Sequence, residues 1–377
     1  MTRPATDAMA AATADPYRPA STTLERNSGA LAPPAGPASF RSDSASVVTV
    51  RSATKTALAE FAKPIAEPLV RVEQRLAGEL QSRFECVAEV LRHGTQLGGK
   101  RLRPALTLLA GQVVGGLNPH HETIATVLEM VHTATLVHDD VLDGADRRRH
   151  VPTVNARWNT DVSILLGDYL FASAYRLAAT LPTPSAAYQI GMAATRVCEG
   201  EMRQVLARDD HELDEATYIE LIRGKTAELC RVACALGAEY GDASDDQIDS
   251  LGRYGDCLGI AFQIADDYLD LWGDHDVVGK TLGTDLLQGK ITLPILRLLQ
   301  TSSAAVRRDV LQVLAGPPTS RLGGIWRHLV ASDAESFTAA TARRYRDEAI
   351  DALRILPDGP AKQSLTDLAD FSVARTF

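Results

Sequence analysis

From about residue 55 onward, apolar residues recur at intervals of three and four positions. This spacing places them on one face of an α-helix, whereas a half-buried strand would need alternation at every second position. Alternating runs of β-branched residues are nearly absent, and the good helix formers Ala, Leu, Glu and Arg are abundant. The pattern therefore predicts one all-α domain over residues 55–377, with helices separated by breaks rich in Gly and Pro.

The first 54 residues differ from the rest in composition. They consist mainly of Ala, Thr, Ser and Pro, with few large apolar side chains. Such a segment cannot bury enough apolar surface to offset the entropy lost on ordering. We therefore expect residues 1–54 to form a disordered leader.

Charge and cysteine content narrow the class of protein. The formal net charge is -9, which disfavours nucleic acid as a partner because its binding needs a basic face. No apolar run approaches the roughly 18 residues that a membrane-spanning helix requires. The five cysteines are scattered and odd in number, so they predict no disulfide framework and favour a cytoplasmic protein.

Two acidic clusters share the pattern D-D-x-x-D. The first, 139–143, closes a predicted helix that starts near Asn118 and stops at Gly144. The second, 266–270, also closes an apolar helix and is followed by Gly273. In each cluster the first and last aspartates are four positions apart, so they share a helical face.

These clusters are electrostatically unfavourable unless something cationic compensates them. Carboxylates four positions apart repel each other and sit badly at a helix C-terminus. One copy would fit a solvated acidic face, but two copies at the ends of apolar helices fit that explanation poorly. Carboxylate oxygens favour hard ions, and Mg²⁺ typically combines one or two carboxylates with phosphate oxygens. The clusters therefore indicate magnesium and a phosphorylated substrate.

Basic residues alternate with the acidic clusters along the chain. They fall in four stretches, 98–104, 146–150, 223–226 and 279–290. Each stretch alone would suit a charged surface. Together with the aspartates they supply what a polyphosphate site needs, namely metal on one side and Lys or Arg on the other. The lysine motifs do not form a P-loop, because no predicted strand precedes them.

The motifs resemble those of the trans-polyprenyl diphosphate synthases, in the isoprenoid-synthase superfamily, and particularly heptaprenyl and octaprenyl diphosphate synthases. The resemblance extends from about residue 85 to the C-terminus. It is carried by GGKRLRP (98–104), HTATLVHDDVLD (132–143), RRR (147–149), LLGDYLF (165–171), GKT (224–226), FQIADDYLD (262–270) and GKTLGTDLLQGKITLP (279–294).

The resemblance implies a catalytic helical bundle with the two aspartate clusters facing each other across a deep central cavity. It implies that an allylic diphosphate ionises, that isopentenyl diphosphate attacks the cation head to tail, and that a proton is then lost. About three Mg²⁺ ions and nearby cations would stabilise the leaving diphosphate most in the transition state. The cavity must exclude water, which would quench the carbocation.

The resemblance also assigns roles to individual residues. Metal binding falls to Asp139, Asp143 and Asp266, with Asp140, Asp267 and Asp270 in support. The allylic diphosphate would contact Arg148, Lys225 and Lys280. Isopentenyl diphosphate would contact Lys100, Arg103, His132 and Arg149. Thr226 and Gln263 would lie near the developing cation. The chain departs from the usual pattern at His150, where the family has Gly, and carries the additional Arg147.

Product length is predicted from the residues before the first aspartate cluster. The positions four and five before Asp139 hold Ala134 and Thr135, where short-chain members of the family place Phe or Tyr. A rise of 1.5 Å per residue puts these small side chains roughly 6–7 Å from Asp139. The next bulky candidates are Phe171 and Tyr175 on the following helix. We therefore expect a product of about six to ten isoprene units (C30–C50), such as a quinone side chain, because the tail has room.

Two alternative functions remain open. One is a shorter-chain farnesyl or geranylgeranyl diphosphate synthase. The other is a class I terpene cyclase, although cyclases usually replace the second D-D-x-x-D by a mixed Asn/Ser/Glu motif and lack the isopentenyl-binding cations. We expect a homodimer, and a heteromer with a non-catalytic partner remains open. A long product could also bring the enzyme to a membrane surface.

Overall fold

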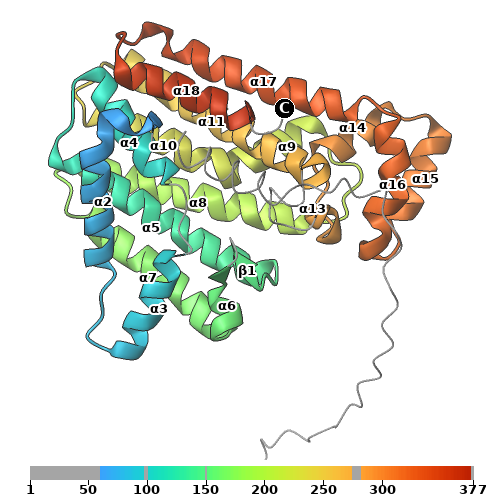
Figure 1. Ribbon diagram of the computed structural model, residues 1–377, viewed down its shortest axis with the longest axis horizontal. Helices are drawn as coiled ribbons and strands as arrows, with labels where there is room; N and C mark the ends of the chain where they lie inside the picture. The colour runs from blue at the N-terminus through green and yellow to red at the C-terminus, as the bar shows by residue number, and fades with distance from the viewer. Residues whose placement is uncertain (1–59, 97–100, 149–150, 274–281, 375–377) are drawn as a thin grey trace, which may run out of the picture. The chain divides into compact units, whose positions relative to one another are not determined.

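The structure is a computed structural model that describes residues 60–96, 101–148, 151–273 and 282–374. These residues belong to one compact unit. Helices make up nearly all of its regular structure (Figure 1), which confirms the all-α prediction. The predicted boundary between leader and domain lies outside the described residues.

The elements follow one another without internal repetition. In chain order they are η1 (Lys63–Ile65), α2 (Ala66–Glu79), α3 (Glu85–Gln96), α4 (Leu102–Val114), α5 (Pro119–Leu142), β1 (Arg147–Arg148), β2 (Val151–Pro152), α6 (Val154–Arg157), α7 (Thr160–Ala178), α8 (Pro184–Leu206), α9 (Glu215–Ile222), η2 (Arg223–Ala227), α10 (Glu228–Glu239), α11 (Asp245–Trp272), α13 (Thr284–Leu287), α14 (Leu293–Thr301), α15 (Ala304–Leu314), η3 (Pro318–Ser320), α16 (Arg321–Val330), α17 (Ala334–Ala352), η4 (Leu353–Ile355) and α18 (Pro360–Ala374).

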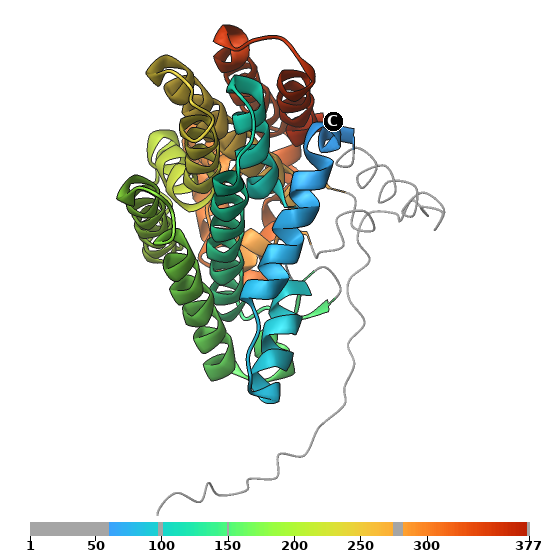
Figure 2. The same cartoon turned by 90° about the vertical axis from the view of Figure 1, so that its left-hand side faces the viewer.

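Helix α5 carries the first acidic cluster and lies among its neighbours. It packs against α2, α4, α7 and α10, and Figure 2 shows it between α2 and α7. Its start is fixed by Asn118, whose side chain accepts a hydrogen bond from His120 N and whose backbone N–H donates to His121 Nδ1 at 3.1 Å. Gly144 follows its last turn with a φ of 60°. The predicted start and stop are therefore confirmed.

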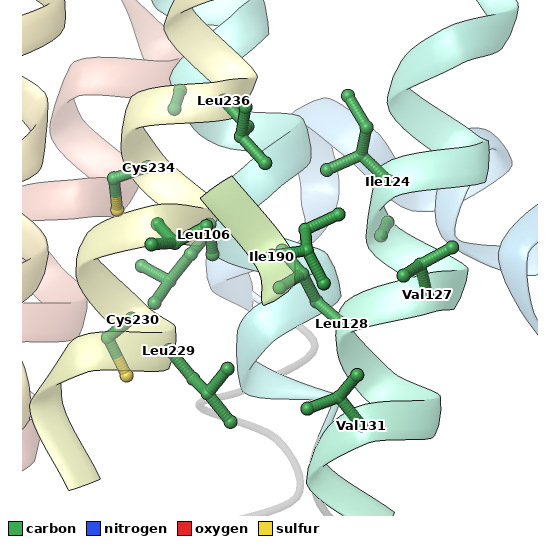
Figure 3. Close-up of a cluster of buried hydrophobic side chains, with 14 of the residues drawn as sticks. Leu106, Ile124, Val127, Leu128, Val131, Ile190, Leu229, Cys230, Cys234 and Leu236 are labelled. Carbon is green, nitrogen blue, oxygen red and sulfur yellow. The ribbon is translucent and has the colours of Figure 1, made fainter. Parts of the chain in front are cut away.

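An apolar core surrounds the first half of α5. Figure 3 shows Ile124, Leu128 and Val131 of α5 facing side chains from α4, α8 and α10. Fully burying one such side chain stabilises the fold by about 1.5–3 kcal/mol. Cys230 and Cys234 of α10 are 1% and 0% exposed, so these thiols pack in the core.

Helix α11 carries the second acidic cluster at its C-terminal end. A capping box between Ser244 and Gln247 starts the helix, and the helix ends at Trp272, just before Gly273, as predicted. A second apolar cluster packs the C-terminal helices against it, including Ile264 of α11 and Leu296 of α14. The end of α11 is thus packed against the C-terminal helices, and Tyr218 of α9 contacts it at Asp267.

One feature of the fold differs from the sequence expectation of no strands. Between α5 and α6 a two-residue antiparallel pair joins Arg147 to Pro152 and Arg148 to Val151. Two residues per strand are too few to produce a periodic pattern, so the sequence gives no signal for it. The pair places Arg148 on a fixed hairpin directly after the first acidic cluster.

No helix in the described ranges combines the length and the apolarity that crossing a bilayer would take.

Glycines set the distance between α10 and α11. A Cβ atom added at Gly255 would lie 2.4 Å from the carbonyl oxygen of Cys230, whereas one at Gly252 would meet nothing closer than 3.9 Å. We expect Gly255→Ala to lower the free energy of unfolding by about 1–3 kcal/mol through overpacking. The control Gly252→Ala, on the same helix, should raise it by about 0.5–1 kcal/mol. Urea denaturation measures both, and equal effects would contradict this close backbone contact.

Candidate active site

The first acidic cluster gathers cations at the end of α5. Lys290 Nζ lies 3.3 and 3.4 Å from the two carboxylate oxygens of Asp143, and Arg208 Nη2 lies 3.8 Å from the same carboxylate. Arg208 follows α8 and Lys290 precedes α14, so two loops distant in sequence meet here. Their charges offset the repulsion between Asp139 and Asp143 and the negative end of the helix dipole.

Asp139 is held in a partly buried position beside charges of both signs. The pKa of Asp139 is raised to about 6, mainly by burial and with smaller contributions from the carboxylates of Glu201 and Asp143, against the opposing effect of Lys225. Without metal, this carboxyl therefore binds a proton more tightly than an ordinary aspartate does.

Lys225 extends from η2, a π-helical turn, toward Asp139. Its ammonium contacts Glu201 Oε2 at 2.5 Å and Gln204 Oε1 at 2.9 Å. Burial alone would lower the pKa of Lys225, but Asp139 and Glu201 outweigh it and the pKa is raised. A Cβ atom at Gly200 would lie 2.7 Å from the backbone nitrogen of Lys225. The missing side chain at that position lets α8 approach the turn closely enough to hold the lysine.

Asp140, the second aspartate of the first cluster, forms an ion pair with Arg148. Arg148 Nε lies 3.0 Å, and Nη2 2.9 Å, from Asp140 Oδ1, and Asp140 is 2% exposed. The structure thus pairs Asp140 with Arg148, whereas Asp143, three positions further on, contacts Lys290.

The second cluster is connected to η2 by a chain of hydrogen bonds. Thr226 Oγ1 donates to Gln263 Oε1 at 2.8 Å, and Gln263 Nε2 donates to Asp267 Oδ1 at 2.9 Å. Tyr218 OH donates to the other oxygen of Asp267 at 2.6 Å. Burial raises the pKa of both Asp267 and Tyr218 well above their ordinary values. Asp267 therefore orients Gln263, and Asp266 beside it is half-buried.

Asp270 has a structural contact that the sequence did not predict. Its two carboxylate oxygens accept hydrogen bonds from the backbone N–H groups of Thr284 and Asp285, at 3.1 and 3.2 Å. The N–H groups in the first turn of a helix need partners from outside the helix ladder, and Asp270 supplies them for α13. The last aspartate of the second cluster thus anchors the segment that leads to Lys290.

The predicted isopentenyl diphosphate residues are only partly described. Arg103 is half-buried on α4, and its Nε has no hydrogen-bond partner among the described residues. His132 is half-buried on α5. Lys100 and Arg149 lie outside the described residues, as do His150 and the predicted allylic diphosphate residue Lys280.

Arg101, which lies between Lys100 and Arg103 in the sequence, makes contacts within the fold. It starts α4 with a φ of 55° and pairs with Glu73 and with Glu129, the latter at 2.8 Å. Glu129 is 1% exposed, so this pair ties α4 to α2 and α5. The second cation of the GGKRLRP motif is therefore structural.

The predicted chain-length residues lie on two adjacent helices. Ala134 is fully buried on α5, and Thr135 Oγ1 donates to the carbonyl of His132 at 2.8 Å. Phe171 on α7 stacks with Tyr175 at 6.3 Å between ring centroids. Tyr175 is 41% exposed, and Phe171 lies beside His138 of α5, with 6.0 Å between the ring centroids.

The implied deep cavity stays a prediction. A hollow of about 420 Å³ is lined by α17 residues, namely Ala340, Arg343, Arg344, Asp347, Glu348 and Asp351. A cavity of about 20 Å³ lies beside Gln204, Tyr218 and Lys290. In the described ranges, no group of three or more His, Cys, Asp or Glu side chains could hold a metal ion.

Several residues of this site were not assigned from the sequence. Glu201, Gln204 and Arg208 come from or follow α8, and Tyr218 comes from α9. Single polar residues on amphipathic helices resemble ordinary surface positions, so they give no signal. Lys290 lies in a basic stretch of the sequence, but only the fold shows that it reaches Asp143.

Comparison with known proteins gives consistent matches. The family model described as polyprenyl synthetase matches residues 84–321. Nonaprenyl diphosphate synthase of Mycobacterium tuberculosis is 36% identical over 332 residues, covering 84% of this chain and 95% of the relative. Heptaprenyl diphosphate synthase component 2 of Geobacillus stearothermophilus is 37% identical over 317 residues, covering 83% and 97%.

A solved structure matches the fold as well. The polyprenyl synthase of Caulobacter crescentus, complexed with calcium and isoprenyl diphosphate, is 32% identical with a TM-score of 0.78. The match covers 84% of this chain and 97% of that structure.

The raised pKa of Asp139 predicts a pH dependence of stability without metal. The folded-state pKa is about 6 against an ordinary 3.8. The stabilising contribution of this carboxyl is therefore fully present below the lower value and is lost as the pH rises through the higher one. With a chelator present, Asp139→Asn should exceed the wild type in free energy of unfolding by about 1–3 kcal/mol near pH 7.5.

The difference in free energy of unfolding between Asp139→Asn and the wild type should shrink as the pH falls toward 3.8, the ordinary pKa of an aspartate. Asp249→Asn, at an exposed position on α11, serves as the control. Denaturation at several pH values measures both variants, and a constant difference for Asp139→Asn would contradict the shifted pKa.

Proposed function

Because the chain belongs to the polyprenyl synthetase family, whose members are prenyltransferases, we propose that it is a polyprenyl diphosphate synthase. It condenses isopentenyl diphosphate head to tail onto an allylic diphosphate and makes a medium- to long-chain all-trans product. The observation that carries the proposal is the meeting of the first aspartate cluster with cations from three separate segments. These are Lys225 from η2, Arg208 after α8 and Lys290 before α14.

Magnesium fits the donor set of the site. Asp139, Asp143 and Asp266 offer hard carboxylate oxygens, and Mg²⁺ typically combines one or two carboxylates with oxygen atoms from a phosphorylated substrate. We assign the binding of about three Mg²⁺ ions to these aspartates together with the substrate diphosphate. When bound, the ions neutralise the charge that develops on the leaving diphosphate.

The chain's own cations complete the diphosphate site. Asp139 and Glu201 hold Lys225 in its charged form, and its ammonium donates to Gln204 Oε1, so it can donate to a phosphate oxygen without first being ordered. Arg148 is held by Asp140 on the hairpin. We assign Lys225, Arg148 and Lys280 to the allylic diphosphate. We assign Lys100, Arg103, His132 and Arg149 to isopentenyl diphosphate.

Thr226 and Gln263 are suited to a position near the developing cation. Thr226 gives its hydroxyl hydrogen to Gln263, so the lone pairs of its oxygen remain available to a positive charge. Gln263 is held in this orientation because its amide nitrogen donates to Asp267. Oriented dipoles of this kind stabilise a charge without reorganising when it forms.

The product length follows from the side chains of α5 that precede the first aspartate cluster. The small side chains Ala134 and Thr135 support a long tail, in line with the nonaprenyl and heptaprenyl products in the relatives' names.

We also propose a homodimer with a predominantly apolar stripe of α8 at its interface. The stripe contains the exposed residues Tyr188, Met192, Met202 and Leu206, which share one helical face. One relative is named as component 2 of a heptaprenyl diphosphate synthase, so a heteromer is the alternative. Light scattering of the purified chain measures its oligomeric state. We also propose that the enzyme is cytoplasmic and that its long product brings it to membrane surfaces.

Incubation with labelled isopentenyl diphosphate, farnesyl diphosphate and Mg²⁺ tests the activity. We expect the purified chain to release diphosphate and form a polyprenyl diphosphate. Asp266→Ala should lower turnover by at least about 10³-fold because it removes a ligand of a charge-neutralising ion. Asp249→Ala on the same helix should leave turnover unchanged. Near-normal turnover of Asp266→Ala would refute the metal assignment, and a cyclic product would favour a cyclase.

Ala134→Phe tests the direction of the product tail. The added ring occupies the space beside α5 but leaves the diphosphate contacts intact, so the product should shorten to about three or four isoprene units. Phe171→Ala should lengthen it. Chromatography of dephosphorylated products measures the length, and an unchanged melting temperature controls for folding. A wild-type product of that short length would show that other residues close the tunnel.

A further inference from the structure

One arginine outside the site joins the two loops that bring cations to Asp143. Arg321, the first residue of α16, is only 7% exposed. Its Nη1 donates to Asp209 Oδ1 at 2.7 Å and to the carbonyl oxygen of Leu286 at 3.1 Å. Asp209 lies in the loop after α8, and Leu286 lies in α13. A single buried guanidinium therefore bridges both segments.

The backbone makes a second connection at the same place. Asp209 N donates to the carbonyl oxygen of Gly289 at 2.8 Å. Both residues have a left-handed backbone, with φ of 57° for Asp209 and 73° for Gly289. This conformation costs a non-glycine residue roughly 1–2 kcal/mol. Asp209 therefore needs compensating contacts, and Arg321 supplies one to its carboxylate.

Each joined segment carries a cation one residue away. Arg208 directly precedes Asp209, and Lys290 directly follows Gly289. Both side chains extend to Asp143, at 3.8 and 3.3 Å. A shift of either segment would therefore move a cation relative to the first aspartate cluster.

The ion pair itself contributes little to stability. The side chain of Asp209 is 51% exposed, and pairs with an exposed partner typically stabilise a fold by less than about 1 kcal/mol. The notable property of Arg321 is that it contacts two segments of the site from a separate helix.

We propose that Arg321 and Asp209 are positioning residues for prenyl transfer, holding Arg208 and Lys290 in register against Asp143. Neither touches the reacting groups. The proposal rests on the proposed function, because the two cations matter only if charge develops at this cluster. A misplacement of about 1 Å can lower a rate about 100-fold, so loss of the bridge should affect turnover more than folding.

Arg321→Met and Asp209→Asn test the bridge, with Arg297→Met as the matched control. Arg297 also joins two C-terminal elements, pairing with Asp333 at 2.9 Å, but it lies outside the site. We expect Arg321→Met to lower kcat about 10- to 100-fold and to raise the Mg²⁺ concentration needed for half-maximal rate. Arg297→Met should keep wild-type kinetics, and Arg321→Lys should recover part of the loss.

The double variant Arg321→Met/Asp209→Asn should be no slower than the worse single variant, because both changes break one contact. Calorimetry with inorganic diphosphate and Mg²⁺ provides a readout that does not need turnover. Binding should weaken in Arg321→Met and remain unchanged in Arg297→Met. If Arg321→Met fails to fold, Asp209→Asn and Arg321→Lys carry the test.

Two outcomes separate this proposal from the proposed function. If the wild type forms product and Arg321→Met matches Arg297→Met in kcat and in diphosphate binding, the positioning role is overturned. If the wild type forms no product, the proposed function fails, and calorimetry still decides whether Arg321 organises the anion site.

Discussion

Asp139 and Asp143 lie one turn apart at the end of α5, where the helix dipole already places negative charge. The positions of their neighbours follow from this electrostatic constraint. Lys290 and Arg208 reach Asp143 from two loops, and Lys225 reaches Asp139 from the π-helical turn. The cations are thereby gathered where a diphosphate would need them, before any substrate arrives.

The fold followed closely from the sequence where a local rule applies. The ends of α5 could be predicted because Asn118 and Gly144 have specific capping roles. The hairpin at Arg148 could not, because its strands are too short to have a period. The aspartates within one cluster also look alike in sequence. Asp143 contacts Lys290, whereas Asp140 pairs with Arg148, and the D-D-x-x-D pattern does not reveal which basic residue each carboxylate meets.

Contacts between residues far apart in the chain could not be predicted from the sequence. Lys290 and Asp143 are 147 positions apart in the chain, and only packed helices bring them together. Glu201 and Tyr218 are similar cases, since each matters through a neighbour on another element. A local motif indicates the chemistry of a site, but it does not reveal the residues that hold its members in place.

The π-helical turn η2 has a mechanical consequence. Lys225 and Thr226 are adjacent in the chain, yet Lys225 contacts Glu201 near the first cluster and Thr226 contacts Gln263 near the second. Both walls of the site therefore share one short piece of backbone. The two aspartate clusters therefore cannot move independently of each other. A displacement near one cluster is transmitted to the other through the adjacent residues Lys225 and Thr226.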